Sequence, residues 1–246
     1  MATARDGSLA RRLAADVADA PVRRVLAGIN WTFVEGPHGC GLAQTPSRDG
    51  NGCRPLEAAG SYAGRGLKEL AGLVVSDNRF EVAIGWAAIN AHFNRRNLQG
   101  PTDNGLALLA RDGDAGGQGR SVVVGRFPDL DRYLPGALVI EREPRPGEHA
   151  EWEAEQLLPG ARRVGITASA LFDGSAERLI DLARGARIAL IGPSTPLAPA
   201  LHEAGVAVLA GLVIEDADGA FGVVAEAGAV RALRRHGRFV ALIRDM

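Results

Sequence analysis

The segment from Arg163 to Pro196 constrains the fold more than any other, because two short apolar runs flank a helical pattern. Val164–Thr167 and Ile188–Ile191 lack polar alternation, which is typical of parallel strands covered by helices on both faces. Between them, Ser175 is placed to cap a helix and Gly185 to end it. The segment therefore predicts a right-handed βαβ unit, whose two polar turns meet at the sheet edge where ligands bind.

The second of these turns, Gly192–Thr195, is rich in small and hydroxyl-bearing side chains and is followed by Pro196 and Pro199. Proline fits the first turn of a helix, where N–H groups lack internal partners, so we expect a helix running to about Ala204. The positive end of that helix would suit a phosphate or carboxylate at the turn. A capped connection without a ligand explains the same residues equally well, and both interpretations stay open.

The rest of the second half continues the same alternation of strand and helix patterns, from residue 122 to residue 243. Such alternation predicts an open parallel sheet with helices on both faces.

The first half of the chain instead mixes helices with a hairpin, which predicts an α+β domain. A stretch rich in Gly and Asp, ending at Gly119, separates the halves and predicts two domains, residues 1–115 and 120–246. The elements expected in the first half are a helix over 8–20, a hairpin of 28–34 with 39–45, and helices over 67–75 and 80–93.

Composition narrows the classes of partner. With 246 residues and 46% apolar side chains, the chain is long enough to bury two domain cores. A formal net charge of -1 gives no field that would attract nucleic acid or an acidic membrane. No apolar run approaches the roughly 18 to 20 residues of a membrane span. Two cysteines, Cys40 and Cys53, and a start without the apolar core of a signal peptide predict a cytoplasmic protein.

Glu141 ends the second strand of the alternation, where an acidic residue holds the ribose in nucleotide-binding Rossmann folds. The turn after the first strand reads Gly125-Arg-Phe-Pro, however, and lacks the glycines of a phosphate loop. Glu141 as an ordinary surface carboxylate therefore carries about equal weight. Ser169 and Ser194 lie on predicted turns, but neither belongs to a G-x-S-x-G motif, which disfavours acyl transfer.

His38 and Cys40, together with Cys53, offer soft donors that could hold zinc or copper. Their spacing matches no recognised set of metal ligands. A histidine on a turn and two small buried cysteines are the favoured interpretation.

Three blocks of the sequence resemble a known family in the same order along the chain. The blocks are Gly28 to Glu35 with Gly41 to Pro46, Glu81 to Ala91, and Gly125-Arg-Phe-Pro through Glu141-Arg-Glu-Pro to Gly192-Pro-Ser-Thr-Pro. In these blocks the chain resembles the heavy-metal-chelation family, which pairs an enolase-N-terminal-like domain with a Rossmann-like domain. The resemblance implies that architecture here: an α+β first domain followed by a Rossmann-like α/β domain.

The resemblance also implies a site between the two domains that binds a metal or a metal-chelating small molecule. As oxygen donors to the metal or its complex, we expect Glu35 and Glu141. Ser194, Thr195 and nearby amides would hold an anionic group of the ligand. The site residues implied by matched positions are Glu35, Asn90, Glu141, Thr167, Gly192, Ser194 and Thr195.

The principal alternative is an enzyme with a nucleotide-like cofactor, an adenine nucleotide or S-adenosylmethionine, whose ribose contacts Glu141. A third interpretation is an assembly protein with a vestigial site. A symmetric homodimer is the default expectation for a soluble oligomer. The sequence names neither the metal, nor the ligand, nor any reaction.

Overall fold

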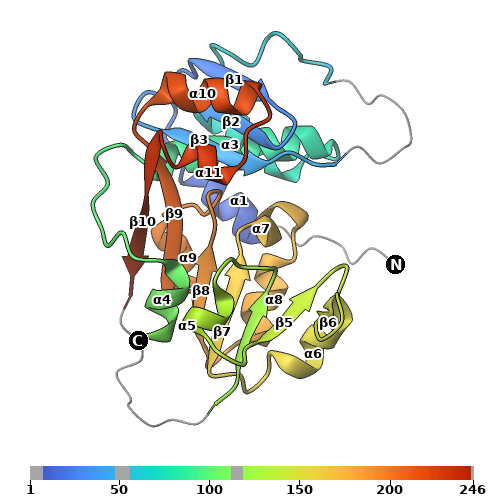
Figure 1. Ribbon diagram of the computed structural model, residues 1–246. Coiled ribbons are helices and arrows are strands. Elements are labelled where there is room, and N and C mark those ends of the chain that lie inside the picture. Colours follow the sequence, from blue (N-terminus) through green and yellow to red (C-terminus); the bar gives the residue numbers. More distant parts are fainter. Residues whose placement is uncertain (1–7, 48–55, 112–118, 245–246) are drawn as a thin grey trace.

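The computed structural model describes residues 8–47, 56–111 and 119–244 (Figure 1). A three-stranded antiparallel sheet forms in the first half of the chain and a seven-stranded, mostly parallel sheet in the second. The predicted mixed class, an α+β half followed by a Rossmann-like α/β half, is confirmed. The stretch predicted to separate the domains falls largely on residues 112–118, which lie outside the described residues, as does Cys53.

The first half builds its small sheet from the predicted hairpin, in which Glu35 pairs with Cys40 across the strands. A further strand, β1, was not predicted, because its four partly exposed residues give no clear apolar pattern. The elements of this half are α1 (Ser8–Ala15), β1 (Arg24–Ala27), β2 (Trp31–Glu35), β3 (Cys40–Gln44), α2 (Leu67–Ala71), the 3-10 helix η1 (Gly72–Val75), α3 (Arg79–Phe93) and α4 (Gly105–Ala110).

Helix α3 is the centre of this half. Every residue from Val82 to Ala91 is buried, as expected of a helix that is apolar around its whole circumference. It packs so closely on β3 that a Cβ atom at Gly41 would lie 1.9 Å from the carbonyl oxygen of Ala87. Glycine at position 41 is therefore required for the sheet and the helix to meet.

The second half contains the predicted βαβ unit, with β7 and β8 parallel and in register. Its elements are β4 (Ser121–Val124), α5 (Leu130–Tyr133), β5 (Leu138–Glu141), β6 (His149–Ala150), the 3-10 helix η2 (Glu151–Glu153), α6 (Ala154–Leu157), β7 (Arg163–Thr167), α7 (Ser169–Asp173), α8 (Ala176–Leu182), β8 (Arg187–Ile191), α9 (Pro199–Glu203), β9 (Val208–Ile214), α10 (Ala217–Ala225), α11 (Val230–Leu233) and β10 (Gly237–Ile243).

The strand order is β10-β9-β8-β7-β4-β5-β6. After β4, the strands β5 and β6 are added on one side of it, whereas β7 to β10 are added on its other side. The carboxyl ends of β4 and β7 therefore form a topological switch point, the place where open α/β sheets bind ligands. The predicted open parallel sheet is confirmed, with an exception at one edge, where β10 pairs antiparallel with β9. Sequence patterns do not report strand direction.

Helices cover both faces of the seven-stranded sheet. Successive residues of one strand join different cores: Ile188 packs with α8 and α9, whereas Ala189 packs with α4. Helix α4 belongs to the first half by sequence but packs on this sheet, where a Cβ atom at Gly105 would lie 2.9 Å from Ala210. No helix in the described ranges is long and apolar enough to cross a membrane.

The connection after β8 differs from its prediction. Helix α9 begins at Pro199, and the residues between Thr195 and Pro199 are not helical. The turn Gly192–Thr195 therefore does not lie at a helix N-terminus, and the argument for an anion site there is wrong. Ser175 likewise makes no capping bond to the helix; its hydroxyl donates to Asp173 at 2.5 Å.

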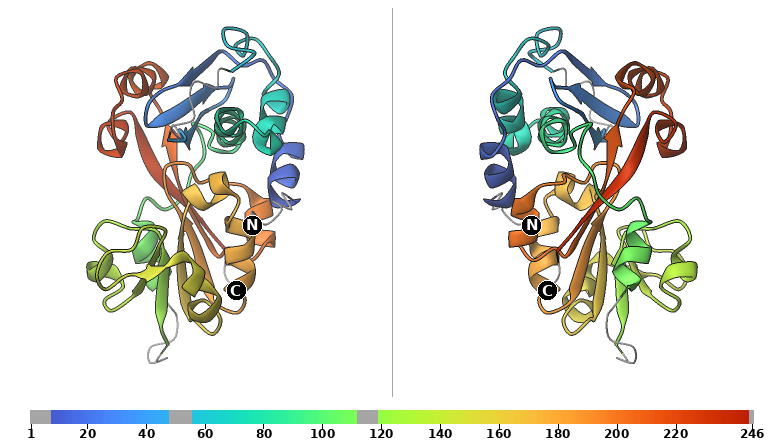
Figure 2. Two further views of the ribbon diagram at one scale, coloured as in Figure 1. Left: turned by 90° about the vertical axis from the view of Figure 1, so that its right-hand side faces the viewer. Right: turned by 90° about the vertical axis from the view of Figure 1, so that its left-hand side faces the viewer.

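The two halves interlock through a shared core. One face of the small sheet packs on α3, while its other face carries Phe33 and Leu42 against α10 and the upper end of β9. Figure 2 shows the small sheet lying between these two helices, above the edge of the large sheet. Helix α10 of the second half thus covers one face of the first half's sheet.

Two asparagines, one turn apart on α3, join the halves through hydrogen bonds. The amide of Asn90 donates to the carbonyls of Leu42 (2.9 Å) and Ser194 (3.0 Å). Asn94 donates to the carbonyls of Thr195 and Leu212 at 3.0 and 3.1 Å. Its oxygen accepts the amide N–H of Leu197 at 2.9 Å. Both side chains are buried, so these bonds are made without competition from water. We call this pair the asparagine clamp.

Replacement of Asn94 by alanine removes three hydrogen bonds and leaves three buried backbone groups without partners. At about 1 to 3 kcal/mol for each such group, we expect a loss of unfolding free energy on the order of 3 kcal/mol or more. Urea unfolding measures it, with Asn97→Ala on the exposed segment after α3 as the control, expected within about 0.5 kcal/mol of wild type. Equal effects of the two substitutions would show that the clamp does not hold the halves together.

Candidate functional site

A cleft of about 610 Å³ opens at the topological switch point. Its floor comes from the ends of β4, β5 and β7, and its sides from η2, α6, α7 and α8. The small sheet closes it from above through residues 29–30 and 44–47. We call it the switch-point cleft. Because the small sheet forms one wall, the cleft exists only where the two halves meet.

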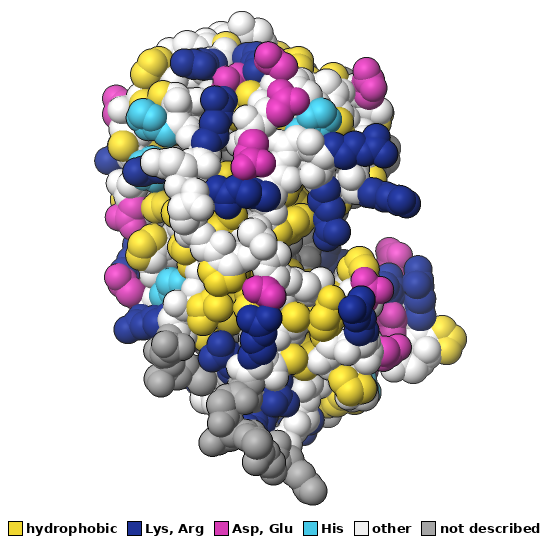
Figure 3. All heavy atoms as spheres, turned by 60° about the vertical axis from the view of Figure 1, so that its left-hand side comes forward, with side chains coloured by type: hydrophobic (Ala, Val, Ile, Leu, Met, Phe, Trp, Pro, Cys, Tyr) yellow, Lys and Arg dark blue, Asp and Glu magenta, His cyan; other side chains and the backbone are white. Residues whose placement is uncertain are grey.

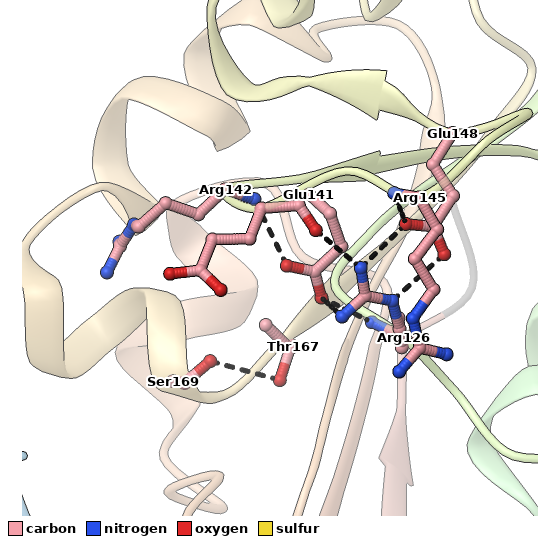
Figure 4. Close-up of polar contacts among 8 residues, drawn as sticks. Arg126, Glu141, Arg142, Arg145, Glu148, Thr167 and Ser169 are labelled. Carbon is pink, nitrogen blue, oxygen red and sulfur yellow. Dashed lines mark hydrogen bonds and ion pairs between the residues drawn. The ribbon is translucent and has the colours of Figure 1, made fainter.

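Glu141, the last residue of β5, presents its carboxylate to this cleft (Figure 4). One oxygen accepts the backbone N–H of Arg126 and the other the backbone N–H of Arg142, each at 3.1 Å. The side chain of Glu141 is 21% exposed. Each oxygen keeps unused acceptor capacity, so the carboxylate is fixed in place and still able to accept a hydrogen bond from a ligand.

Arg126 and Glu148 hold the backbone around Glu141. The guanidinium of Arg126 makes two bonds to the carboxylate of Glu148, at 2.9 and 2.7 Å, and one to the carbonyl of Glu143 at 2.6 Å. The bonds from the Arg126 guanidinium to the Glu148 carboxylate, together with the bond from the backbone N–H of Arg145, lower the pKa of Glu148 to about 2. Glu148 is therefore ionised at neutral pH, and the bidentate pair fixes the turn that supplies the Arg126 N–H to Glu141.

Thr167 and Ser169 add hydroxyl groups next to Glu141. Thr167 ends β7, Ser169 begins α7, and the Ser169 hydroxyl donates to that of Thr167 at 3.2 Å. The neighbouring strand end is Gly125, whose φ of 96° favours glycine and whose added Cβ would lie 2.7 Å from the Thr167 side chain. This glycine therefore keeps the backbone close to Thr167 at the floor of the cleft.

Arg142 crosses the cleft in the direction away from Arg126 (Figure 4). Its guanidinium pairs with Asp173 of α7 at 2.8 Å and with Glu151 of η2 at 3.4 Å. All three side chains line the cleft. The sequence analysis did not identify Arg142 or Glu151 as site residues, although Arg142 directly follows Glu141 in a block that carries the family resemblance.

Of the seven residues expected in the site, Glu141 and Thr167 line the switch-point cleft and the other five do not. Asn90 belongs to the asparagine clamp, and the Ser194 and Thr195 carbonyls accept bonds from that clamp. Gly192 lies near the carboxyl end of β7, where an added Cβ would be 3.0 Å from Ala168. Asn90, Ser194 and Thr195 therefore belong to the junction of the two halves, whereas Gly192 contacts the second half, where its N–H donates to the carbonyl of Ala210.

Glu35 lies at the opposite end of β2 from the cleft. The cleft contains Asn30, just before β2, whereas Glu35 ends the strand roughly 16 Å further on at about 3.3 Å per residue. Glu35 lines a separate cavity with three arginines, and Arg24 Nε donates to it at 2.6 Å. The expectation that Glu35 and Glu141 are donors to the same metal or metal complex is therefore wrong, because the two carboxylates line different cavities.

Within residues 8–47, 56–111 and 119–244, no group of three or more His, Cys, Asp and Glu side chains is arranged to bind a metal ion. Cys40 is buried, and burial together with the charge of Glu35 raises the pKa of its thiol to about 11.

Two family models match the chain, and both carry the description "Putative heavy-metal chelation". One matches residues 10–93 and the other, of the DUF364 family, matches residues 113–243. No curated protein matches the chain significantly.

Solved structures agree over the whole chain. A DUF364-family protein of unknown function from Desulfitobacterium hafniense is 28% identical, with a TM-score of 0.84 over 97% of this chain and 98% of that one. Another, from Pyrococcus horikoshii, is 20% identical, with a TM-score of 0.76 over 96% and 98%, and shows the fold alone. Because one family model matches more than half of the chain, this protein belongs to the DUF364 family, described as "Putative heavy-metal chelation".

Proposed function

We propose that the protein binds a small polar organic molecule in the switch-point cleft, and that this molecule supplies the ligands to a metal. The observation that carries the proposal is the carboxylate of Glu141, held by two amide N–H groups at the switch point of the sheet. The family description supports the link to metal chelation.

The cleft offers a prepared acceptor for hydroxyl or amine groups. Glu141 is oriented before any ligand arrives, because the Arg126–Glu148 pair fixes the turn beside it. A group that is already in its bound conformation loses little conformational entropy on binding. The hydroxyls of Thr167 and Ser169 extend the same polar floor.

The guanidinium of Arg142 supplies the opposite charge. It lines the cleft between Asp173 and Glu151, and guanidinium groups bind carboxylates through paired hydrogen bonds. A ligand that carries both hydroxyl donors and an oxyanion would satisfy Glu141 and Arg142 together. Hydroxy acids and catechols with acidic substituents have this chemistry, and they also chelate metals.

A metal ion without its chelator fits less well. Heavy metals favour thiolate and imidazole donors, whereas the cleft is lined by carboxylates, hydroxyls and arginine among the described residues. The guanidinium of Arg126, whose Nη1 lies 4.0 Å from Glu141, further disfavours a bare cation at that carboxylate. The metal therefore enters this proposal as cargo of the organic ligand.

Glu141→Gln tests the assignment. Glutamine keeps the size of the side chain but loses the charge and one acceptor, so we expect affinity about 10- to 100-fold lower. Calorimetric titration with hydroxy acids, catechols and aminocarboxylates, each alone and loaded with Cu(II) or Fe(III), measures it. Glu69→Gln, on the exposed side of α2, is the control and leaves affinity unchanged. The proposal fails if metal salts alone bind and no chelator does, or if Glu141→Gln binds as well as wild type.

The second candidate is an enzyme with a nucleoside-like cofactor, favoured by the place of Glu141 in the strand order. If β4 is counted as the first strand, the order β6-β5-β4-β7-β8-β9 is that of a Rossmann sheet. Glu141 ends β5, the second strand of that sheet, where Rossmann folds place a carboxylate that contacts the ribose. The turn after β4 does not suit a pyrophosphate, because the Arg126 side chain turns to Glu148 and α5 has only four residues. The cofactor of this candidate is therefore a nucleoside without a pyrophosphate, such as adenosine or S-adenosylmethionine.

A thermal-shift comparison separates the two candidates. If the second is right, adenosine and S-adenosylmethionine raise the melting temperature, and dinucleotides raise it no further, because the turn after β4 gives them no additional contact. A ligand at about one hundred times its Kd contributes roughly 2.7 kcal/mol, which for a protein of this size is a shift on the order of 5 to 10 °C. Stabilisation by chelators, with none by adenosine or S-adenosylmethionine, rejects the nucleoside candidate.

A further inference from the structure

The turn between β1 and β2 places an isoleucine in the wall of the switch-point cleft. Ile29 lines the cleft and is 77% exposed, more than any other large hydrophobic side chain in the described ranges. A single exposed isoleucine on a protein surface needs no explanation. Ile29 differs because it shares a cavity with Glu141, whose carboxylate two amide N–H groups hold in place.

Two hydrogen bonds of Asn30 hold the turn that presents Ile29. The side-chain amide of Asn30 donates to the carbonyl of Ala227, just after α10, at 2.6 Å. Its backbone carbonyl accepts the N–H of Thr45, just after β3, at 3.1 Å. The turn is thus tied to α10 and to its own sheet, so Ile29 projects from a backbone that is fixed before any ligand arrives. Such a contact costs little conformational entropy when a ligand binds.

Ile29 shares the cleft with apolar side chains from both halves of the chain. These are buried and form its inner wall, whereas Ile29 leaves most of its side chain accessible. A group that lies against the inner wall would therefore also meet a large apolar surface at Ile29. The buried apolar residues of the cleft include Pro46, Ala154, Ala170, Phe172 and Leu179.

The size of the cleft exceeds what its polar groups require. Its volume of about 610 Å³ lies within the range of roughly 300 to 1,000 Å³ found for pockets that enclose drug-sized ligands. Such pockets are lined mainly by apolar side chains, while a few polar groups fix the orientation of the ligand. A small hydroxy acid held by Glu141 and Arg142 would fill only part of this volume. The rest of the space suits an apolar group on the same ligand.

The exposed isoleucine is not part of a general apolar surface. Figure 3 shows charged side chains of both signs interspersed over the upper part of the face it draws, where the small sheet and α10 lie. In the described ranges, the other exposed large hydrophobic side chains, Val75, Trp152 and Ile243, do not line the cleft. Exposed apolar surface of this kind is therefore specific to Ile29 in this cavity.

We propose that the ligand of the switch-point cleft carries a ring-sized apolar group, and that Ile29 covers this group in the complex. The inference rests on the proposed function, and it selects the aryl members of that ligand class over aliphatic hydroxy acids. The hydroxyl and oxyanion meet Glu141 and Arg142, and the ring lies between Ile29 and the inner apolar wall. A ring suits this place better than a flexible chain, because it brings apolar area with few rotatable bonds to immobilise.

Mandelate and lactate are a matched pair of probes for this inference. Both are 2-hydroxy acids with the same hydroxyl and carboxylate, and a phenyl group in mandelate replaces the methyl group of lactate. Each is titrated without metal into the full chain, up to about 50 mM at constant ionic strength. We expect mandelate to bind about tenfold more tightly than lactate, because its phenyl group removes more apolar surface from water.

Three variants locate the effect. Ile29→Ser should weaken the binding of mandelate about three- to tenfold and change that of lactate less than about twofold, because only the phenyl group reaches position 29. Val75→Ser, at an exposed valine outside the cleft, is the control and should leave the affinity for both acids unchanged. Glu141→Gln should weaken both acids, since both use the same carboxylate. Circular dichroism confirms that Ile29→Ser, which alters a mostly exposed side chain, remains folded.

The outcomes separate this inference from the function on which it rests. If Glu141→Gln weakens both acids but mandelate binds no more tightly than lactate, the inference is overturned and the proposed function stands. The same holds if Ile29→Ser weakens both acids equally, or neither. If neither acid binds saturably, or if Glu141→Gln binds both as wild type does, the proposed function fails and the inference fails with it.

Discussion

The asparagine clamp on α3 is the interaction on which the rest of the structure depends. The four carbonyls and one N–H that Asn90 and Asn94 bind fix how α3 lies over the sheet edge, because a shift of the helix would leave these buried backbone groups without partners. Apolar packing holds α3 against its own sheet, whereas the clamp bonds it to the second half. The clamp thereby sets the height of the small sheet above β4, β5 and β7.

Two cavities follow from this placement, one at each end of β2. At the Trp31 end, the small sheet closes over the strand ends and encloses Glu141. At the other end, Glu35 meets three arginines and the start of α10. The two carboxylates differ because of their neighbours: amide N–H groups orient Glu141 and leave it able to accept a ligand hydrogen bond, whereas guanidiniums nearly enclose Glu35.

The sequence predicted the architecture well, because strand length and helix period are local properties. The βαβ unit, the hairpin and α3 were all predicted from their sequence patterns. Strands β1 and β6 were missed because they are too short to show a pattern, and no local pattern indicates the direction of β10. The site was harder. Pro196 and Pro199 suggested an early helix start, but the chain stays non-helical until Pro199. The turn after β8 is instead bound by the asparagine clamp, because its Ser194 carbonyl accepts from Asn90. Glu35 was placed in the wrong cavity and Arg142 was not predicted as a site residue, because the direction of a side chain depends on tertiary packing.

The central claim is that the cleft made by the clamp binds an organic chelator at Glu141. The most direct measurement is a crystal structure of protein purified without an affinity tag and without added metal or chelator. We predict density for a small organic molecule within hydrogen-bonding distance of the Glu141 carboxylate, with any metal held by that molecule. A metal ion ligated only by protein side chains, or a bound molecule that leaves Glu141 untouched, would contradict the account.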